Sequence, residues 1–305
     1  MPRVSVVIPA YNAAALLAPT LESVLNSTYR DLEVIVVNDG SQDETAAVAS
    51  DFGPRVRVIS QKNAGMSASR NRGIQESDSE FIALLDSDDI WHPQKIMVQI
   101  AAFEAHAEHA YCFTEFTSWN GGDPLLQFGS QPRTGAVEPN LTGWIYHKLL
   151  LTHWALPSSM MIRRQAWNST GPFLCNDQKT DDWEYFVRAS RSYQFLKLAE
   201  PFVLYRQHPG SLSRKLQAKN TTELMRESLI AQYGTSSPDG TPVDGPELER
   251  RRYVGWRNFA DAHCARGSLG TGLGTFGKLL LTGPRRGESV QRLAKSLVRR
   301  AFPKR

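Results

Sequence analysis

Short apolar segments alternate with segments of helical periodicity through the first third of the chain. The apolar segments have the length of buried strands, and the segments between them place apolar residues three or four positions apart. Strands are expected at residues 4–8, 33–37, 56–59 and 81–85, and helices at 16–25, 44–52 and 67–76. Strands that alternate with helices predict βαβ units with right-handed crossovers. The pattern therefore predicts an α/β fold with a mainly parallel central sheet flanked by helices.

The later part of the chain has a less regular pattern. Helices are expected at 93–109, 141–151 and 182–190, and strands at 110–116, 158–162 and in one or two pieces within 195–205. Residues 120–139 and 233–245 are rich in Gly, Pro and polar side chains, which predicts loops. Helical patterns return at 248–265 and 287–302. We therefore expect a main α/β domain at 1–215 and a C-terminal helical extension at 216–305.

Composition narrows the class of protein. The 305 residues are 41% hydrophobic and 22% charged, which is ordinary for a soluble globular chain. The three cysteines are far apart and form no CxxC pair, which argues against a disulfide framework and a zinc site and fits a reducing compartment. The first residues enter an apolar strand without a signal-peptide pattern, and no stretch is long and apolar enough to span a bilayer. We expect a cytoplasmic protein.

The net charge of +4 is unevenly distributed. From Pro284 onward there are eight basic residues and one acidic residue, a net charge of +7, so the rest of the chain carries −3. A slightly acidic body without a basic and aromatic stripe argues against a nucleic-acid partner. The basic residues of the tail are Arg285, Arg286, Arg292, Lys295, Arg299, Arg300, Lys304 and Arg305.

The same tail has an apolar face beside its basic residues. That face consists of Leu279, Leu280, Leu281, Val290, Leu293, Ala294, Leu297, Val298 and Phe302. The pattern is typical of a helix that lies on an anionic membrane surface, which would place the protein peripherally on the inner face of the cell membrane. A terminal helix packed on the body, with a solvated basic face, explains it equally well.

Three carboxylates follow the fourth apolar segment. Asp86, Asp88 and Asp89 stand where a buried parallel strand is expected to end, and ligands of open α/β sheets bind at that edge. Crowded carboxylates repel one another and lose hydration, and a divalent cation relieves both penalties. The alternative is a turn that caps the helix opened by Pro93.

The first two strands also end in polar residues. Pro9, Tyr11 and Asn12 follow the first strand, and they lack the G-x-G-x-x-G turn of a dinucleotide-binding enzyme. Tyr11 could stack on a nucleobase, although a simple turn with a helix cap is the alternative. Asp39 follows the second strand, where its carboxylate could accept hydrogen bonds from a base or a ribose.

A small-residue segment precedes the helix expected at 67–76. Asn63 and Gly65 allow close approach of the backbone to a ligand, and the free N–H groups of the helix start suit a phosphate. Arg70 could form charge-assisted bonds to a diphosphate. A solvated helix face is the competing interpretation.

Two further stretches carry candidate chemistry. Asp181 and Asp182 open an aromatic-rich helix, where a desolvated carboxylate could act as a general base; the alternative is a capped helix with core aromatics such as Trp183. His208 lies in a turn beyond a strand, from which it could reach a cation held by the Asp86–Asp88 pair. A lone histidine is nevertheless more often structural.

Together these motifs resemble the family 2 glycosyltransferases, which are inverting enzymes with the GT-A fold. The resemblance covers residues 4–213. It rests on six motifs in matching order, which are VSVVIPAYN, VIVVNDGSQDET, NAGMSASRNRG, FIALLDSDD, TDDWEYFVR and YRQHPGSLS.

The resemblance implies roles for matching positions. Asp39 would contact the base or ribose of a nucleotide-sugar donor, and Asp86 with Ser87 would lie near its ribose and sugar. Asp88 would bind Mg²⁺ or Mn²⁺, and His208 matches a metal-ligand position found in part of the family. With Asp86 and Asp88 as the working pair, Asp89 is expected to be the cap that starts the next segment.

The catalytic base is implied at the acidic pair. Asp182 matches the acid of the family's Glu-Asp motif, and Asp181 replaces the Glu before it, so either acid could be the base and Asp182 is favoured. Trp154, Ser158 and Trp183 are expected on the acceptor side.

The implied reaction moves a sugar from a nucleotide-diphosphate donor to a hydroxyl of a glycan or lipid-linked acceptor by metal-assisted single displacement. The resemblance implies a UDP-linked donor, since uridine is the commonest base in the family. A nucleotidyltransferase would normally have a Gly-rich first loop with a basic residue, which this chain lacks. A sugar-nucleotide-binding module without transfer would not need Asp88, Asp182 and His208 together.

Overall fold

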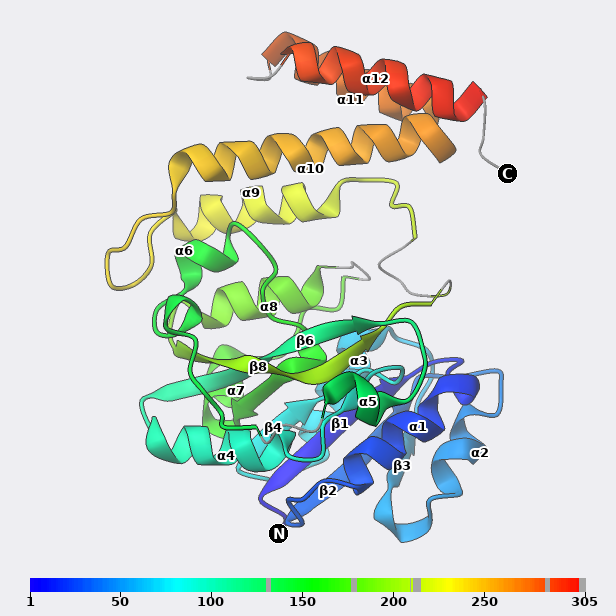
Figure 1. Cartoon of the computed structure of the whole chain (residues 1–305), viewed down its shortest axis with the longest axis vertical. Coiled ribbons are helices and arrows are strands. Elements are labelled where there is room, and N and C mark those ends of the chain that lie inside the picture. The colour runs from blue at the N-terminus through cyan, green and yellow to red at the C-terminus, as the bar shows by residue number, and fades with distance from the viewer. Residues whose placement is uncertain (130–132, 177–179, 209, 211–214, 283–285, 302–305) are drawn as a thin grey trace.

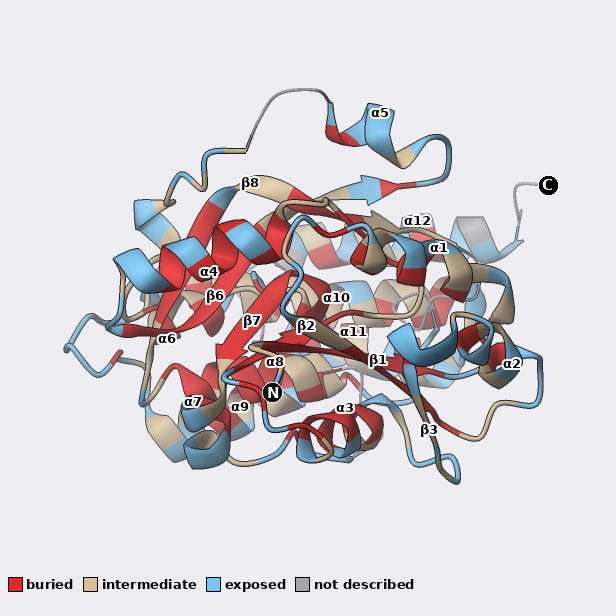
Figure 2. Cartoon of the chain, turned by 90° about the horizontal axis from the view of Figure 1, so that it is seen from below, coloured by how far each residue is buried: buried red, intermediate tan, exposed pale blue. Residues whose placement is uncertain are grey.

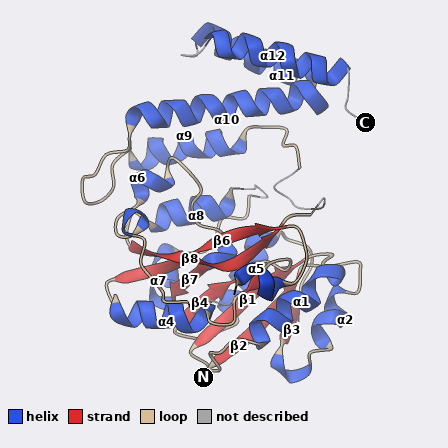
Figure 3. Ribbon diagram, viewed as in Figure 1, coloured by secondary structure: helices blue, strands red, loops and turns tan. Residues whose placement is uncertain are grey.

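The computed structural model describes residues 1–129, 133–176, 180–208, 210, 215–282 and 286–301. Its strands form one eight-stranded sheet in the order β3-β2-β1-β4-β7-β6-β8-β5, with helices on both faces (Figures 1 and 3). The central strands are buried, whereas α2 and α5 have exposed outer faces (Figure 2). The α/β architecture predicted from the sequence is confirmed.

The first half of the sheet is parallel, as predicted. Its strands are β1 (Val4–Ala10), β2 (Leu32–Asn38), β3 (Arg57–Ser60) and β4 (Phe81–Leu84), and its helices are α1 (Ala14–Leu25), α2 (Thr45–Ser50) and α3 (Met66–Gln75). All seven residues of β1 are buried, because Val6 and Ile8 pack into one hydrophobic core while Val7 packs into the core on the opposite face. Burial on both faces explains the continuous apolar run.

The second half of the sheet is mixed. Its strands are β5 (Ile90–Trp91), β6 (His109–Trp119), β7 (Met160–Arg163) and β8 (Gln194–Arg206). Among the pairings of the described strands, β4 with β7, β6 with β7 and β5 with β8 are antiparallel, while β6 and β8 are parallel. The helices here are α4 (Lys95–Ala105), α5 (Pro124–Phe128), α6 (Tyr146–Leu149), α7 (Arg164–Thr170) and α8 (Asp181–Ala189).

Several elements differ from the sequence expectation. β8 is one strand of 13 residues, which continues through Pro201 because the register shifts in the facing part of β6, at Thr114–Phe116. A bulge of this kind tolerates a proline without an N–H donor. The sequence analysis missed β5, α5, α7 and α11, and it made α6 too long.

In the described part of the chain after the sheet, the helices are α9 (Thr221–Tyr233), α10 (Gly245–Arg266), α11 (Leu269–Thr282) and α12 (Arg286–Ala301). They are stacked outward from α8, with α11 and α12 on the far side of α10 (Figure 1). Leu229 of α9 belongs to the same core as Trp183 of α8, whereas α10 and α11 share a separate small core. Over the residues described, no helix has the length and apolar character required to cross a membrane.

Candidate active site

The loop after β4 places two acids against basic partners. Arg70 Nη2 donates to Asp86 Oδ1 at 2.5 Å, and Asp88 Oδ2 lies 2.9 Å from His208 Nε2. Burial raises the pKa of Asp88, and repulsion from Asp86 adds to this, while His208 opposes it. The structure therefore brings the predicted pair and His208 together, although residues 209 and 211–213 of the same motif lie outside the described residues.

Asp89 is not the helix cap that the sequence analysis proposed. It is fully buried, accepts from Ser158 Oγ at 2.5 Å and from the Arg206 backbone N–H at 3.0 Å, and leads directly into β5. Burial raises its pKa well above the ordinary range, and Asp88 contributes next. Asp89 therefore joins the acidic loop to the end of β8 and positions Asp88 opposite His208.

Arg70 was predicted to bind a diphosphate, and the structure shows its side chain buried beside the predicted donor site. Its side chain is buried in α3, with the guanidinium against Asp86 and near the ring of Phe173. Burial opposes the charge, but the carboxylates of Asp86, Asp182 and Asp181 outweigh it and raise the pKa of Arg70. Arg70 is thus the internal counter-charge of the acidic cluster.

The two acids of α8 have different surroundings. Asp181 is buried and its Oδ2 accepts from Ser67 Oγ at 3.2 Å, while its Oδ1 has no hydrogen-bond partner within the described part of the chain. Burial raises the pKa of Asp181. Asp182 is 17% exposed, and its Oδ2 lies 3.7 Å from His153 Nε2. Asp182 is therefore the more accessible of the two.

Helix α3 contacts both the acidic start of α8 and the acidic loop after β4. Ser67 and Arg70 stand one turn apart on it, and they bond to Asp181 and Asp86 respectively. Gly73, one turn further, lies so close to the sheet that a Cβ there would be 2.5 Å from Val7 Cγ1. The contact fixes α3 against β1, and through it the spacing of the acids.

The loops after β1 and β2 contact each other at the same edge of the sheet. Asn12, whose φ is +48°, accepts from the Gln42 N–H through Oδ1 at 2.8 Å, and Tyr11 is 48% exposed. Pro9 was expected to follow the first strand, but it is buried within β1, which continues to Ala10. Tyr11 and Asn12 are thus the exposed members of the predicted group, and Pro9 is buried.

Asp39 organises the loop before α3. Its carboxylate accepts from the N–H groups of Ala64 and Gly65 at 2.9 and 2.8 Å, and from Gln61 Nε2 at 2.8 Å. Gly65 has a φ of +90°, a conformation that favours glycine, and Asn63 is exposed beside it. Asp39 therefore shapes the loop that presents Asn63.

Two of the three residues expected on the acceptor side lie in the interior, so this expectation is corrected for them. Trp183 is buried, with its Nε1–H donating to the Leu149 carbonyl at 2.8 Å, and Ser158 is buried between Asp86 and Asp89. Neither presents side-chain surface to an acceptor. Trp154 is 41% exposed.

The ligand atoms present fit a divalent cation. Neighbouring ligands of an octahedral Mg²⁺ at about 2.1 Å lie about 3 Å apart. The 2.9 Å between Asp88 Oδ2 and His208 Nε2 matches that separation. Both side chains are about a quarter exposed, which leaves room for further ligands.

A second group of possible metal ligands lies elsewhere. His106, Glu108 and His109 hold ligand atoms within 4.8 Å of one another at the start of β6. The end of β6 pairs with Arg206, so β6 separates this group from Asp88 by roughly 30 Å at 3.3 Å per residue. It is therefore distinct from the predicted cation site.

The sequence analysis missed Ser67, His153 and Arg206. Ser67 stands in a quoted motif, but nothing in a single sequence indicates that its hydroxyl bonds to Asp181. His153 and Arg206 reach the acids only through the folded chain. Contacts between residues this distant in sequence leave no local signal.

Comparison with known proteins identifies relatives of this chain. A family described as glycosyl transferase family 2 matches residues 5–167, more than half of the chain. The chain is 29% identical over 235 residues to chondroitin synthase of Escherichia coli, which covers 75% of this chain and 33% of that protein. It is 28% identical over 238 residues to hyaluronan synthase of Pasteurella multocida, which covers 76% and 24%. The chain thus spans a quarter to a third of the length of these synthases.

Two solved structures share the fold. TarS 1-349 of S. aureus in complex with UDP-GlcNAc superposes with a TM-score of 0.66 at 15% identity, and the match covers 98% of this chain and 89% of that one. The mannosyltransferase PcManGT of Pyrobaculum calidifontis, in complex with GDP-Man and Mn²⁺, has a TM-score of 0.54 at 18% identity, with coverage of 100% and 88%. The helices beyond the sheet are included in both matches.

Proposed function

The chain belongs to glycosyl transferase family 2, and from this we propose that it transfers a sugar from a nucleotide-diphosphate sugar to a hydroxyl group of a glycan acceptor, with inversion at the anomeric carbon. The observation that carries the proposal is the acidic cluster around Arg70, which gathers Asp86, Asp181 and Asp182 beside the Asp88–His208 pair. The complexes of TarS with UDP-GlcNAc and of PcManGT with GDP-Man support a nucleotide-sugar donor.

The donor would bind at the loops after β1, β2 and β3. The exposed ring of Tyr11 can stack on a base, and Asn63 is presented beside it by the loop that Asp39 holds. We propose uridine as the base, in line with the family resemblance and with the UDP-GlcNAc complex of TarS.

Asp88 and His208 would hold the cation. Mg²⁺ or Mn²⁺, when bound there, would supply positive charge to neutralise the departing nucleoside diphosphate. The Mn²⁺ complex of PcManGT supports this assignment. We expect a chelator to abolish transfer and added Mn²⁺ to restore it; full activity in the chelator would contradict the metal assignment.

Asp182 is the proposed base. As the acceptor oxygen bonds to the anomeric carbon and the bond to the diphosphate breaks, the acceptor proton passes to Asp182. Its partial exposure and its position beside His153 support this role over Asp181, which is buried against Ser67. Asp181 would then be a positioning residue.

The Asp182→Asn variant tests the assignment. We expect loss of transfer by several orders of magnitude, while titration with UDP and Mn²⁺ by calorimetry gives an unchanged affinity. The matched control is Asp78→Asn, an exposed acid between α3 and β4. Loss of UDP affinity in Asp182→Asn would overturn the base assignment, and binding of sugar nucleotides by the wild type without any transfer would favour a binding module.

A membrane surface is the second proposed partner, and the packing of α12 supports it. The helix faces α10 through polar side chains, since Ser289 Oγ lies 2.8 Å from Tyr253 Oη and Ser296 bonds to Asp261. Two residues of the predicted apolar face, Leu279 and Leu293, belong to or pack against the small core of α10 and α11, so the prediction is wrong for them. Val290, Leu297 and Val298 remain 55%, 37% and 59% exposed. Arg292 and Lys295 lie on the same helix, while Arg285, Phe302, Lys304 and Arg305 of the predicted face lie outside the described residues. An apolar stripe with basic neighbours suits anionic lipids at the inner face of the cell membrane.

A further inference from the structure

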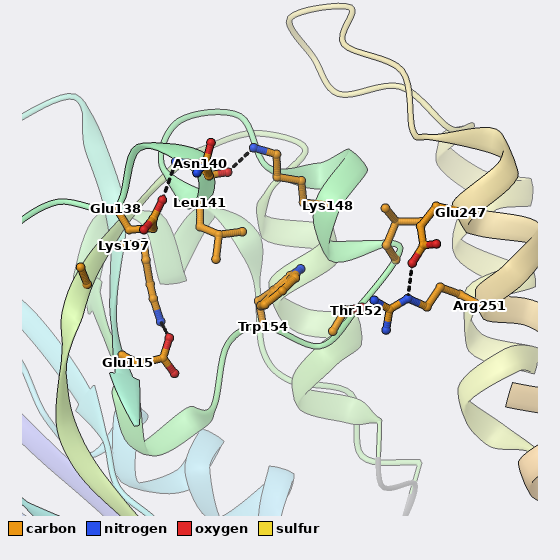
Figure 4. Close-up of a pocket in the computed structure, with 12 residues that line it drawn as sticks. Glu115, Glu138, Asn140, Leu141, Lys148, Thr152, Trp154, Lys197, Glu247 and Arg251 are labelled. Atoms are coloured by element: carbon orange, nitrogen blue, oxygen red, sulfur yellow. Dashed lines mark hydrogen bonds and ion pairs between the residues drawn. The ribbon is translucent and has the colours of Figure 1, made fainter. Parts of the chain in front are cut away.

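A cavity of about 570 Å³ lies between the sheet and the first turn of α10 (Figure 4). Strands β6 and β8 supply one wall through Glu115 and Lys197, and α10 supplies the other through Glu247 and Arg251. Trp154 lies between these walls with its ring toward the space (Figure 4). The volume is within the range of small-molecule sites.

The chain connects this cavity directly to the proposed base. Trp154 follows His153, whose Nε2 lies 3.7 Å from Asp182 Oδ2. Four residues after Trp154, Ser158 accepts from the Asp86 N–H at 3.0 Å. The loop that presents the indole is thus anchored at the acids on both sides of the reaction centre.

The charges around the cavity balance. The charged residues that line it are Glu115, Glu138, Lys148, Lys197, Glu247 and Arg251. Three are acidic and three are basic, so their sum is zero. Each cation already has an acceptor, because Lys197 pairs with Glu115 at 3.0 Å, Arg251 with Glu247 at 2.7 Å, and Lys148 with the Asn140 carbonyl.

This lining favours an uncharged polar ligand. Two of the three lining cations are already paired with carboxylates, so a carboxylate or phosphate would gain Lys148 alone against the repulsion of three glutamates, and an alkyl chain would desolvate charged groups without compensation. A sugar ring can place its apolar face on the exposed indole and its hydroxyls against the paired acids and bases.

Building on the proposed function, we propose that the cavity binds the acceptor, and that the acceptor is an uncharged oligosaccharide with one ring stacked on Trp154. The stacked ring is a neighbour of the sugar whose hydroxyl reacts at Asp182. Trp154 is a specificity-determining residue that acts on acceptor binding and not on the donor.

Saturation-transfer NMR measures this binding without turnover. The probes are the neutral disaccharides cellobiose, lactose and diacetylchitobiose, and a hyaluronan tetrasaccharide as the carboxylate-bearing counterpart. We expect at least one neutral probe to bind the wild type more tightly than the tetrasaccharide does. Its affinity should fall roughly tenfold in Trp154→Ala, which corresponds to the loss of one stacking contact.

Two further variants separate stacking from folding. Trp154→Phe retains an aromatic face and should recover most of the affinity, whereas Leu126→Ala, at an exposed position on α5, should leave it unchanged. Thermal melting confirms that each variant is folded. Unchanged neutral-sugar binding in Trp154→Ala, or tighter binding of the tetrasaccharide, overturns the proposal.

The donor half is measured separately by the melting shift with UDP and Mn²⁺. If that shift is absent while sugar binding depends on Trp154, the transfer function fails and the cavity stands as a glycan site. If the shift is present in every variant and the binding of no neutral sugar depends on Trp154, the donor function stands and the acceptor assignment fails.

Discussion

The acids of the site differ in their surroundings more than in their chemistry. Asp89 and Asp181 are buried and bonded to serine hydroxyls, whereas Asp86, which is paired with Arg70, is partly exposed like Asp88 and Asp182. Only the partly exposed acids are placed to meet a ligand. The sequence analysis identified all five acids, but it assigned Asp89 wrongly because the contacts of that residue come from Ser158 and from β8.

Arg70 provides a test of the internal counter-charge. Arg70→Met leaves the surrounding carboxylates without their cation, and we expect the free energy of unfolding to fall by about 3–5 kcal/mol. Urea titration followed by circular dichroism measures this loss. The matched control is Arg72→Met on the same helix, where an exposed pair with Glu76 contributes at most about 0.5 kcal/mol. Equal losses in the two variants would contradict the counter-charge role.

Among the elements, α3 lies close against the sheet at Gly73. Gly73→Ala would place a Cβ 2.5 Å from Val7 Cγ1 and 3.1 Å from Val37 Cγ2, so α3 must shift. We expect a loss of about 1–3 kcal/mol in unfolding free energy, together with reduced transfer because Ser67 and Arg70 shift with the helix. Thermal melts of the two variants measure the change in stability. A Cβ on Gly274 in α11 meets no atom within 4 Å, so Gly274→Ala should leave the stability unchanged or raise it.

Helix α4 contains a lysine that the proposed reaction does not use. Lys95 is fully buried, donates to Gln99 Oε1 at 2.7 Å and lies 4.0 Å from the ring centre of Trp91. Burial lowers its pKa to about 7 from 10.5. Between these values the unfolded chain binds a proton that the folded chain does not, so this group makes stability rise with pH over that window.

Replacement of Lys95 tests that pH dependence. We expect Lys95→Met to be more stable than the wild type near pH 7, by an amount that shrinks as the pH approaches 10. Thermal melts at one-unit intervals from pH 6 to 10 measure it. Lys219→Met removes an exposed lysine and should give a constant difference; the same pH trend there would exclude burial as the cause.

The prediction of strands and helices succeeded where the local sequence pattern determines the secondary structure. It failed where contacts with distant residues determine it. β1, β2, β3 and β4 follow from apolar runs alone. Helix α11 contains Gly270, Gly272, Gly274 and Gly277, which disfavour a helix in isolation. It forms because it packs closely on α10, where a Cβ on Gly272 would be 2.5 Å from Cys264 Sγ. Such tertiary compensation cannot be predicted from one segment.

For the whole molecule, the stacked helices place α12 at the end remote from the sheet (Figure 1). We expect the full chain to float with vesicles that contain phosphatidylglycerol. With vesicles of pure phosphatidylcholine, the protein should stay at the bottom of the gradient. High salt should release it, since each basic residue near the surface contributes about 1 kcal/mol.

Paired serine substitutions locate the contact. Val290→Ser with Val298→Ser should abolish flotation, whereas Leu125→Ser with Leu126→Ser removes an even more exposed apolar pair on α5 and should not. Identical flotation of both double variants would show that α12 is not the binding face.

Strand β8 has a consequence for protein engineering. The same 13-residue strand carries Lys197 in the wall of the cavity and Arg206, whose Nε donates to the Asp88 carbonyl at 2.7 Å. A chimera could be built to take over the acceptor preference of a relative. If only loops were exchanged, it would combine a cavity wall from that relative with the Asp88–His208 cation site of this chain. The transplant should therefore include residues 194–208 as one cassette, whereas the donor loops after β1, β2 and β3 can be exchanged as a separate module.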